Sequence, residues 1–201
     1  MTRGHLIAFE GGEASGKSTQ AARLAADLGA VLTREPGGTE LGRRIRELVL
    51  DPAAAIADFT EALLMAADRA QHVAEVIGPA LARGQDVVTD RFIPSSLAYQ
   101  GYGRGLDVDQ LRRISAWAAG GLEPDVVVLL DMPREVAAAR LQGRDRMEAA
   151  GDAFHERVTA GYRELAAADP DRWVVIDGTG SIDEVGVRVG EAFDKWLAAH
   201  Q

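Results

Sequence analysis

The sequence predicts an α/β fold with a five-stranded parallel sheet and helices on both faces. Five short apolar runs predict strands, and they alternate with longer segments whose apolar residues recur at helical spacing. Such alternation is typical of parallel sheets with right-handed crossovers. The 201 residues contain no internal repeat, low-complexity tract or linker. We therefore expect one domain that spans 1–201.

The first half of the chain alternates strands and helices, with glycine and proline between them. We expect strands at 6–9, 30–33 and 86–90, and helices at 16–28, 40–50 and 58–83. Gly29 and Gly84 suit the ends of helices, and Thr39 can cap the start of one. Arg34-Glu-Pro-Gly-Gly38 predicts a loop, and Pro79 leaves open an interruption of the third helix.

The second half continues the alternation. We expect a functional loop with a short helix at 93–105, helices at 107–119, 152–168 and 181–199, and strands at 125–131 and 173–177. Pro133 suits the first turn of a further helix. The charged segment that follows, 142–151, has no apolar face.

Composition excludes several classes of protein. The formal charge of −9 argues against broad nucleic-acid binding, which needs a basic face. The chain has no cysteine, so disulfides, thiolate catalysis and cysteine zinc sites are excluded. No apolar run approaches the roughly 18 residues of a membrane span, and the first residues do not resemble a signal peptide. We expect a cytoplasmic protein without a membrane or nucleic-acid partner.

One glycine-rich segment predicts a phosphate-binding loop. The pattern G-x-x-x-x-G-K-S begins at Gly11 and ends at Ser18, between a predicted strand and a predicted helix. In such a loop Lys17 reaches the outer phosphates and Ser18 holds Mg²⁺. The alternative is a turn that binds nothing, but the strand and helix on either side favour the loop. The predicted ATP-binding residues here are Gly11, Gly12, Glu13, Ala14, Ser15, Gly16, Lys17, Ser18 and Thr19.

A phosphate loop by itself does not distinguish kinases from GTPases and motor ATPases. A GTPase would need the guanine-reading pattern N-K-x-D, which the sequence lacks. Asp177-Gly-Thr-Gly180 matches D-x-x-G, but it lies too late in the chain for a switch.

Two predicted strands end in an aspartate that could approach the loop. Asp90 ends Val87-Val-Thr-Asp90, as a metal-holding Walker-B aspartate does, and Arg91 follows it directly. We favour a metal role for Asp90 together with Ser18. For Asp131, at the end of the later strand, we favour the alternative of capping the next helix.

Arginines elsewhere suggest contacts to phosphate. Arg34 ends a predicted strand, where ligands bind in such sheets, although a solvated surface arginine is an equal alternative. A second group concentrates positive charge on the segment without an apolar face: Arg140, Arg144 and Arg146, beside Asp145 and Glu148. This pattern favours a mobile lid at about 142–152 that closes over a transferring phosphoryl group, rather than a solvated helix end.

Taken together, these motifs resemble the thymidylate kinase family. The resemblance rests on Phe9-Glu-Gly-Gly-Glu13, Arg34-Glu-Pro-Gly-Gly-Thr39, Asp90-Arg-Phe-Ile-Pro-Ser-Ser96 with Ala98-Tyr-Gln-Gly101, and Asp145-Arg-Met-Glu148. It covers nearly the whole chain. It implies a P-loop nucleotide kinase fold, transfer of a phosphoryl group from ATP to dTMP with Mg²⁺, and a homodimer.

The resemblance also implies roles for single residues. Glu13 is expected at the 3′-hydroxyl of the acceptor sugar, and Arg34 and Arg91 at its 5′-phosphate. Tyr99 would crowd the 2′ position. The full predicted acceptor set is Glu13, Arg34, Pro36, Met65, Arg69, Arg91, Ser95, Ser96, Tyr99 and Gln100. The predicted catalytic set is Lys17, Arg91, Arg144 and Arg146, with Arg140 on the donor phosphates, which is the bacterial form with its catalytic arginine in the lid.

One position departs from the family pattern. A phenylalanine that stacks on thymine commonly stands four residues before the arginine matched by Arg69, and here that position is Met65. A thioether packs well on rings but gives no ring stacking. Met65 therefore leaves open a preference for another nucleoside monophosphate. A nucleotide-dependent switch that hydrolyses slowly is the rival from a different class.

Overall fold

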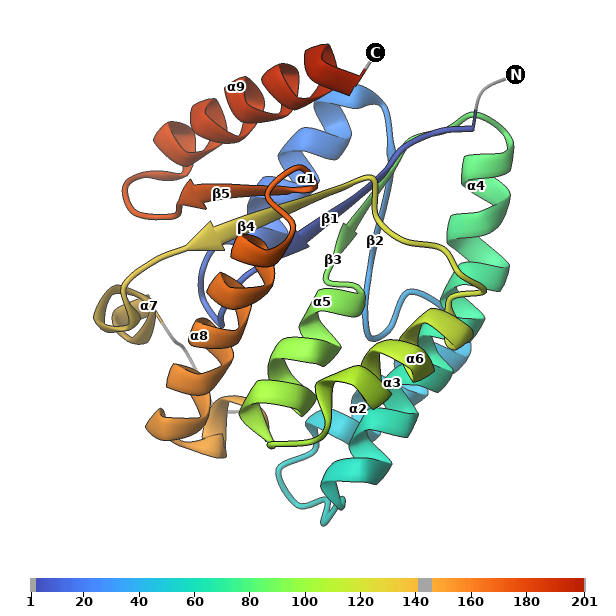
Figure 1. Ribbon diagram of the computed structural model, residues 1–201, viewed down its shortest axis with the longest axis vertical. Helices are drawn as coiled ribbons and strands as arrows, with labels where there is room; N and C mark the ends of the chain where they lie inside the picture. The colour runs from blue at the N-terminus through green and yellow to red at the C-terminus, as the bar shows by residue number, and fades with distance from the viewer. Residues whose placement is uncertain (1–2, 141–145, 201) are drawn as a thin grey trace.

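The computed structural model describes residues 3–140 and 146–200, and its centre is a parallel sheet of five strands (Figure 1). The strands are β1 (Leu6–Glu10), β2 (Val31–Arg34), β3 (Val87–Asp90), β4 (Val126–Asp131) and β5 (Trp173–Asp177). Their order is β2-β3-β1-β4-β5, so β1 is central and β3 and β4 flank it. The predicted fold class is confirmed.

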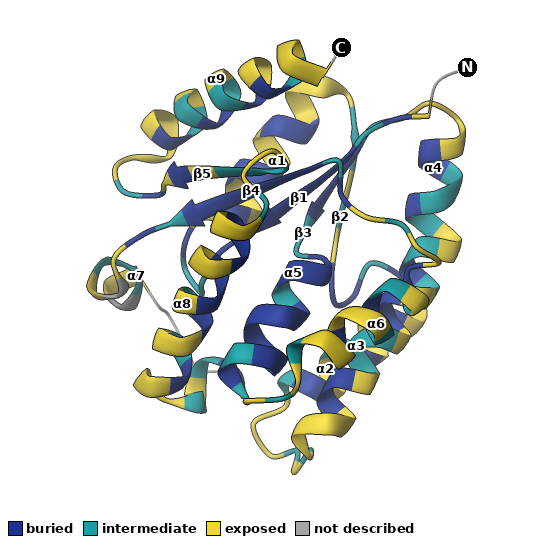
Figure 2. Cartoon of the chain, viewed as in Figure 1, coloured by how far each residue is buried: buried dark blue, intermediate teal, exposed yellow. Residues whose placement is uncertain are grey.

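Helices cover both faces of the sheet (Figure 1). One face packs against α1 (Lys17–Leu28) and α9 (Ile182–His200), which bury leucine, valine and aromatic side chains on the strands. The other face packs against α3 (Asp58–His72), α4 (Gly78–Ala82), α5 (Ile93–Ser96), α6 (Val108–Ala118) and α8 (Asp152–Ala168). Because apolar side chains cover the central strands from both sides, β1, β3 and β4 are almost fully buried (Figure 2).

The remaining elements connect these layers. They are α2 (Glu40–Leu50), the π-helical turn η1 (Val73–Ile77), the π-helix η2 (Leu97–Gly103), α7 (Arg134–Arg140) and the short 3₁₀ turn η3 (Glu148–Ala150). Thr39 caps α2 by accepting a hydrogen bond from the Gly42 amide, as predicted. Pro79 does not break the long helical run, because it occupies the first turn of α4 after the π-turn.

The expectation of a loop with a short helix at 93–105 is correct for the short helix and wrong for the loop. Residues 93–103 are helical, first as α5 and then as η2, and most of their side chains are buried. The segment packs along α8, and this tertiary contact outweighs the low helix propensity of its glycine and serine residues. π-Helical segments are rare in proteins, and those that occur often lie at functional sites. The π-helical geometry of η2 is therefore consistent with a functional role for this segment.

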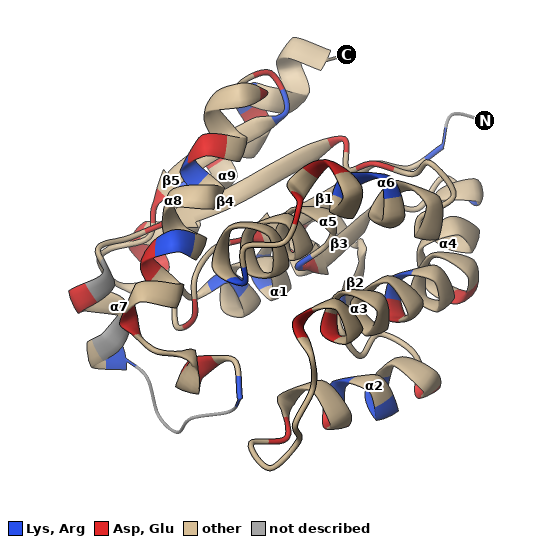
Figure 3. Ribbon diagram, turned by 60° about the horizontal axis from the view of Figure 1, so that its bottom comes forward, with Lys and Arg blue, Asp and Glu red and all other residues tan. Residues whose placement is uncertain are grey.

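The carboxyl ends of all five strands lie at one edge of the sheet and are charged: Glu10, Arg34, Asp90, Asp131 and Asp177. Both α2 and α3 carry positive and negative side chains (Figure 3). Among the described residues, no helix has the length and apolar character that crossing a membrane requires.

Candidate active site

The phosphate loop connects β1 to α1 at the centre of the sheet. Gly11 has φ +145° and Gly16 has φ +86°, angles that L side chains rarely adopt. A Cβ on Gly11 would also lie 2.7 Å from the Leu130 carbonyl oxygen. Lys17 is buried, and its Nζ donates to the Gly12 carbonyl at 3.4 Å. Burial and the nearby Arg91 guanidinium lower the pKa of Lys17, although nearby carboxylates oppose that shift.

The predicted metal residues meet beside this loop. Ser18 Oγ donates to Asp90 Oδ2 at 2.5 Å, across from α1 to the end of β3. Asp90 Oδ1 is buried and has no hydrogen-bond partner within the described residues. No group of three or more His, Asp or Glu side chains in the described chain could hold a metal by itself. One carboxylate and one hydroxyl fit Mg²⁺, which takes its other ligands from water and phosphate.

Asp131, on the other side of β1, has a different partner. Its carboxylate accepts hydrogen bonds from Arg163 of α8, at 3.0 Å to Oδ2 and 3.1 Å to Oδ1. Asp131 therefore pairs with an arginine where a helix cap was expected, and the preference for Asp90 at the metal stays a prediction.

Arg91 is the centre of the polar network at this edge. Its Nη1 donates to the Gly11 carbonyl, Ser95 Oγ and Tyr162 Oη at 3.0–3.2 Å. Its Nη2 donates to Glu13 Oε1 at 2.6 Å and to Tyr99 Oη at 2.9 Å. The backbone of Arg91 has φ +75°, which is rare for a residue with a side chain. This strained angle is typical of functional sites, where the surrounding contacts hold it.

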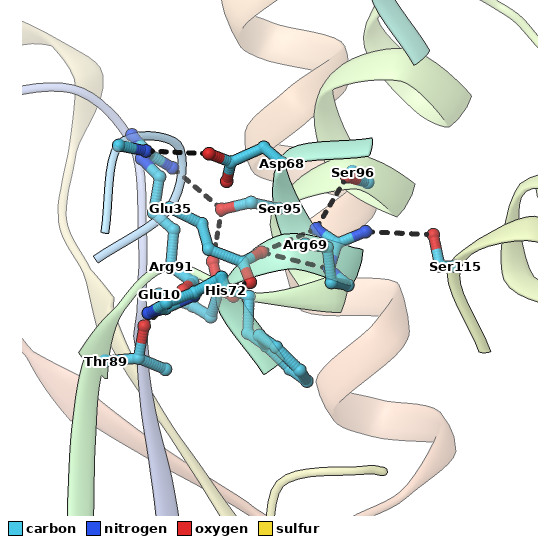
Figure 4. A network of polar contacts seen from close by, with 12 residues as sticks. Glu10, Glu35, Asp68, Arg69, His72, Thr89, Arg91, Ser95, Ser96 and Ser115 are labelled. Carbon is cyan, nitrogen blue, oxygen red and sulfur yellow. Dashed lines mark hydrogen bonds and ion pairs between the residues drawn. The ribbon is translucent and has the colours of Figure 1, made fainter. Parts of the chain in front are cut away.

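The pKa values of two carboxylates near Arg91 are shifted in opposite directions. Burial opposes ionisation of Glu13, but Arg91, Lys17 and the Tyr99 hydroxyl outweigh it and hold the pKa of Glu13 at about 2. Burial raises the pKa of Glu10, which accepts hydrogen bonds from Ser95 Oγ, Tyr162 Oη and the Phe92 amide. Glu13 is therefore a fixed negative charge facing Arg91. Figure 4 shows Glu10, Ser95 and Arg91 in one connected network.

A cavity beside Arg91 collects almost all of the predicted acceptor residues. It is lined by Glu35, Pro36, Arg46, Leu50, Met65, Arg69, Arg91, Phe92, Ser95, Ser96, Tyr99, Gln100 and Met147. Two predicted acceptor residues are not in this lining. Glu13 lines a neighbouring cavity, and Arg34 is exposed at the end of β2. We call this space the acceptor cavity.

Arg69 is held firmly in the wall of the acceptor cavity. Its guanidinium donates to Glu35 Oε2 and Ser96 Oγ at 3.0 Å and to Ser115 Oγ at 3.2 Å, as Figure 4 shows. It also lies over the Phe92 ring, 5.4 Å from the centroid. Its donors are thus fixed in direction before any ligand arrives, which favours recognition of an oxygen acceptor.

A larger cavity, of about 510 Å³, lies on the other side of Glu13. Its walls come from the phosphate loop, the end of β4 and α8, with Asp131, Glu148, Asp152 and His155 among its charged or titratable residues. Glu13 lines this larger cavity while its partners Arg91 and Tyr99 line the acceptor cavity. Glu13 therefore stands at the boundary between the two.

The two lid arginines that the structure describes, Arg140 and Arg146, have partners in different parts of the fold. Arg140 donates to the Gly180 carbonyl at 3.3 Å, after β5. Arg144 lies outside the described residues. Arg146 donates to Glu61 Oε2 of α3 at 2.5 Å and to the Val49 carbonyl at 2.8 Å, so its guanidinium lies on the acceptor side.

Comparisons with known proteins agree with this geometry. A family model described as thymidylate kinase matches residues 9–189. This chain belongs to the thymidylate kinase family. Proteins named thymidylate kinase are 52% identical in Synechococcus sp., over 92% of this chain and 91% of that one, and 49% identical in Deinococcus radiodurans, over 96% and 97%.

A solved member of the family shares the fold. The crystal structure of thymidylate kinase from Ehrlichia chaffeensis superposes with a TM-score of 0.81 at 32% identity, over 96% of this chain and 99% of that one. Membership makes this chain a nucleoside monophosphate kinase, and its family phosphorylates dTMP.

Sequence reasoning missed several residues of this thymidylate kinase site. Glu10 gave a usable signal, since it ends the strand that enters the phosphate loop. Tyr162 gave none, because α8 brings it to Arg91 from 71 residues away. His72 of α3 is buried, with Nδ1 2.9 Å from Glu35 Oε1 and Nε2 2.6 Å from Thr33 Oγ1, and its sequence context gave no signal of this pairing.

Proposed function

We propose that this chain transfers the γ-phosphoryl group of ATP to dTMP, giving ADP and dTDP, as a cytoplasmic homodimeric enzyme of one domain. The observation that carries the proposal is the acceptor cavity, which lies directly beside the phosphate loop and shares Arg91 with it. A protein that only hydrolyses a nucleotide has no need of a second, preorganised pocket at this position.

The residues of the cavity suit a thymine base. Arg69 offers N–H donors, which suit the O4 oxygen of thymine rather than the amino group of cytosine. Gln100 adds an amide, and Met65 offers an apolar surface for the flat ring. Tyr99, which also bonds Glu13 at 2.7 Å, lies where the sugar would pass between the two cavities.

Arg91 is suited to hold the acceptor phosphate in line with the donor. It already spans the loop carbonyl of Gly11 and the carboxylate of Glu13, so a phosphate beside it would lie next to the transferring group. A phosphate oxygen is ionised at neutral pH and attacks without a general base. Catalysis then rests on positioning and on positive charge from Lys17, Arg91 and the arginines at 140 and 144.

Mg²⁺ fits the pair formed by Ser18 and Asp90. When bound with ATP, it would neutralise charge on the donor phosphates. The Ser18 hydroxyl would be a direct ligand, and the unpartnered Asp90 Oδ1 would hold the ion or its water.

A homodimer is supported by an exposed apolar stripe on α3. Phe59, Leu63, Ala67, Ala70 and Ala74 follow helical spacing on the outer side of the α3–η1 run, and all are exposed. Trp117 of the neighbouring α6 is 87% exposed, and Phe59 on the stripe is 52% exposed. Contiguous apolar surface of this kind is typical of protein–protein interfaces.

The reaction is tested by ADP release with MgATP and a panel of acceptors: dTMP, dUMP, UMP, CMP, dCMP, AMP and GMP. We expect fast turnover with dTMP and a loss of at least about a hundredfold in Arg91→Ala, since the variant loses a charge-assisted contact to phosphate. A preference for another acceptor would support the kinase activity but contradict dTMP as its acceptor. Slow ADP release that ignores every acceptor would favour the switch protein.

A further inference from the structure

A buried carboxylate outside the predicted site joins the acceptor cavity to residues 146–147. Glu61 of α3 is fully buried. Its Oε1 accepts a hydrogen bond from Gln100 Nε2 at 2.8 Å. Its Oε2 accepts from Arg104 Nη2 at 3.1 Å and from Arg146 Nη2 at 2.5 Å.

These donors keep Glu61 ionised. Burial alone would raise its pKa, but the hydrogen bonds from Gln100, Arg104 and Arg146 outweigh burial and lower it. Arg104 is in turn fixed over the Phe154 ring, 4.7 Å from its centroid, and Arg146 is fixed by the Val49 carbonyl. An ionised carboxylate accepts hydrogen bonds and cannot donate one.

The charge of Glu61 therefore determines which way the Gln100 amide faces. The amide has one end that donates and one that accepts, and the two ends differ only by rotation of the group. Only the NH₂ end can face an ionised Glu61. The carbonyl oxygen at the other end of the amide is left for the acceptor cavity that Gln100 lines.

We propose that Glu61 is a positioning residue that sets base selectivity by holding the Gln100 carbonyl toward the acceptor cavity. The inference rests on the proposed function. A carbonyl there accepts from the N3–H of thymine or uracil, and it repels the N3 lone pair of cytosine. Arg146 and Arg104 contribute by keeping Glu61 charged, so the end of the predicted lid serves the choice of base.

The test compares Glu61→Gln with wild type in kcat/KM for dTMP, dUMP and dCMP. The amide at position 61 can also donate, so Gln100 is free to turn its NH₂ toward the cavity. We expect the dTMP to dCMP ratio to fall about tenfold or more, the equivalent of one hydrogen bond. The dTMP to dUMP ratio should not change, because both bases present the same imide edge. KM for ATP should also not change.

A double variant that exchanges the two side chains, Glu61→Gln with Gln100→Glu, is a second test of the inference. A carboxylate at 100 again directs an oxygen to the cavity, while the amide at 61 donates to it. We expect this double variant to recover most of the dTMP to dCMP ratio lost in Glu61→Gln. The control is Glu75→Gln, an exposed carboxylate further along the same helical run that bonds Gln71, and it should resemble wild type.

The outcomes separate this inference from the proposed function. A wild-type enzyme that does not prefer dTMP to dCMP would refute the proposed function. A wild type with that preference, combined with a Glu61→Gln variant whose rates fall equally for all three acceptors, would show a merely structural role and overturn the inference. An exchanged pair that recovers none of the lost ratio would also overturn it.

Discussion

Arg91 depends on side chains that come from distant parts of the chain. Tyr162 donates to buried Glu10, contacts Ser95 and accepts from Arg91, so one hydroxyl serves three polar groups. Ser95, from the motif that contains Arg91, also bonds both Arg91 and Glu10, and Tyr162 of α8 adds a second link between them. The direction of the Arg91 guanidinium is therefore set by its own motif together with a distant helix.

We expect Tyr162→Phe to reduce kcat/KM for dTMP about tenfold, because Arg91 loses a partner that directs it and Glu10 loses a donor. The ring remains, so stability should fall by only about 1–2 kcal/mol. Steady-state kinetics and thermal unfolding measure both. Tyr102→Phe is the control, since its hydroxyl bonds exposed Glu164 away from the site. Equal kinetics for the two variants would remove Tyr162 from the site.

Asp68 makes stability depend on pH. Its Oδ1 accepts from the Gly37 amide and its Oδ2 is buried without a partner in the described structure. Burial and repulsion by Glu35 raise the pKa of Asp68 from 3.8 to about 6. The folded state therefore holds a proton that the unfolded state has already released, and stability falls as the pH rises between about 4 and 6.

We expect Asp68→Asn to remove this dependence. The amide oxygen can still accept from Gly37, and no buried charge forms above pH 6. Relative to wild type, the variant should gain about 1–3 kcal/mol in free energy of unfolding between about pH 4 and pH 7. Urea unfolding at several pH values measures the gain. A constant difference across that range would contradict the assignment of the pH dependence to Asp68.

At the scale of elements, most of the fold follows from local pattern. Alternating apolar runs and glycine or proline stops predict the strands and the long helices, because those signals are local. Within 93–103 the sequence predicts only a short helix, since its glycine and serine residues favour a loop. Their helical state depends on packing against α8, and that contact joins segments far apart in the chain.

The residues of the site likewise fall into those that a local motif predicts and those that only tertiary contacts bring there. The phosphate loop, Asp90-Arg91 and the residues of 95–100 lie in short motifs, so the sequence predicts that they belong to the site. Glu61 and Tyr162 carry no motif, and only the three-dimensional structure shows what they touch. Arg146 is the reverse case. Its charged segment predicts a contact with the phosphates of ATP. Its ion pair with Glu61 is a tertiary contact that composition does not reveal.

The contact between α8 and η2 can be tested with glycine. A Cβ on Gly161 of α8 would lie 2.5–2.8 Å from the Tyr102 side chain, whereas a Cβ on Gly190 of α9 would meet nothing within 4 Å. Both glycines are inside long helices, so alanine brings the same gain in helix propensity. We expect Gly190→Ala to stabilise by about 0.5–1 kcal/mol and Gly161→Ala to destabilise by about 1–3 kcal/mol.

Chemical unfolding of the two variants gives the comparison. Because both substitutions bring the same gain in helix propensity, the difference between their free energies of unfolding measures the steric contact at Gly161 alone. Two variants of equal stability would show that α8 and η2 can separate without penalty. In that case α8 would not hold Tyr162 rigidly at Arg91.

At the scale of the whole molecule, the order of the strands explains where the site is. β1 is central, and its two neighbours, β3 and β4, lie on opposite sides of it, so the strand order reverses at β1. Ligands of open parallel sheets bind at such a point, beyond the carboxyl ends of the strands. The phosphate loop follows β1 and Asp90 ends β3, so donor and metal residues meet there. The acceptor cavity is completed by α3 and η2 on one side.

The same arrangement gives α3 two separate faces. Arg69 and His72 are buried inward, while Leu63 is 46% exposed on the outward stripe. A homodimer through this stripe would cover apolar surface without entering the acceptor cavity. It would also brace the helix that carries Arg69.

We expect Leu63→Glu to dissociate the proposed homodimer, because a charge buried at an interface without a partner costs several kcal/mol. Sedimentation velocity at micromolar concentration should give a dimer for wild type and a monomer for the variant. Val187→Glu, an equivalent change at an exposed valine of α9, should remain a dimer. A dimer that survives Leu63→Glu but dissociates in Val187→Glu would move the interface to α9, and a monomeric wild type would refute the homodimer itself.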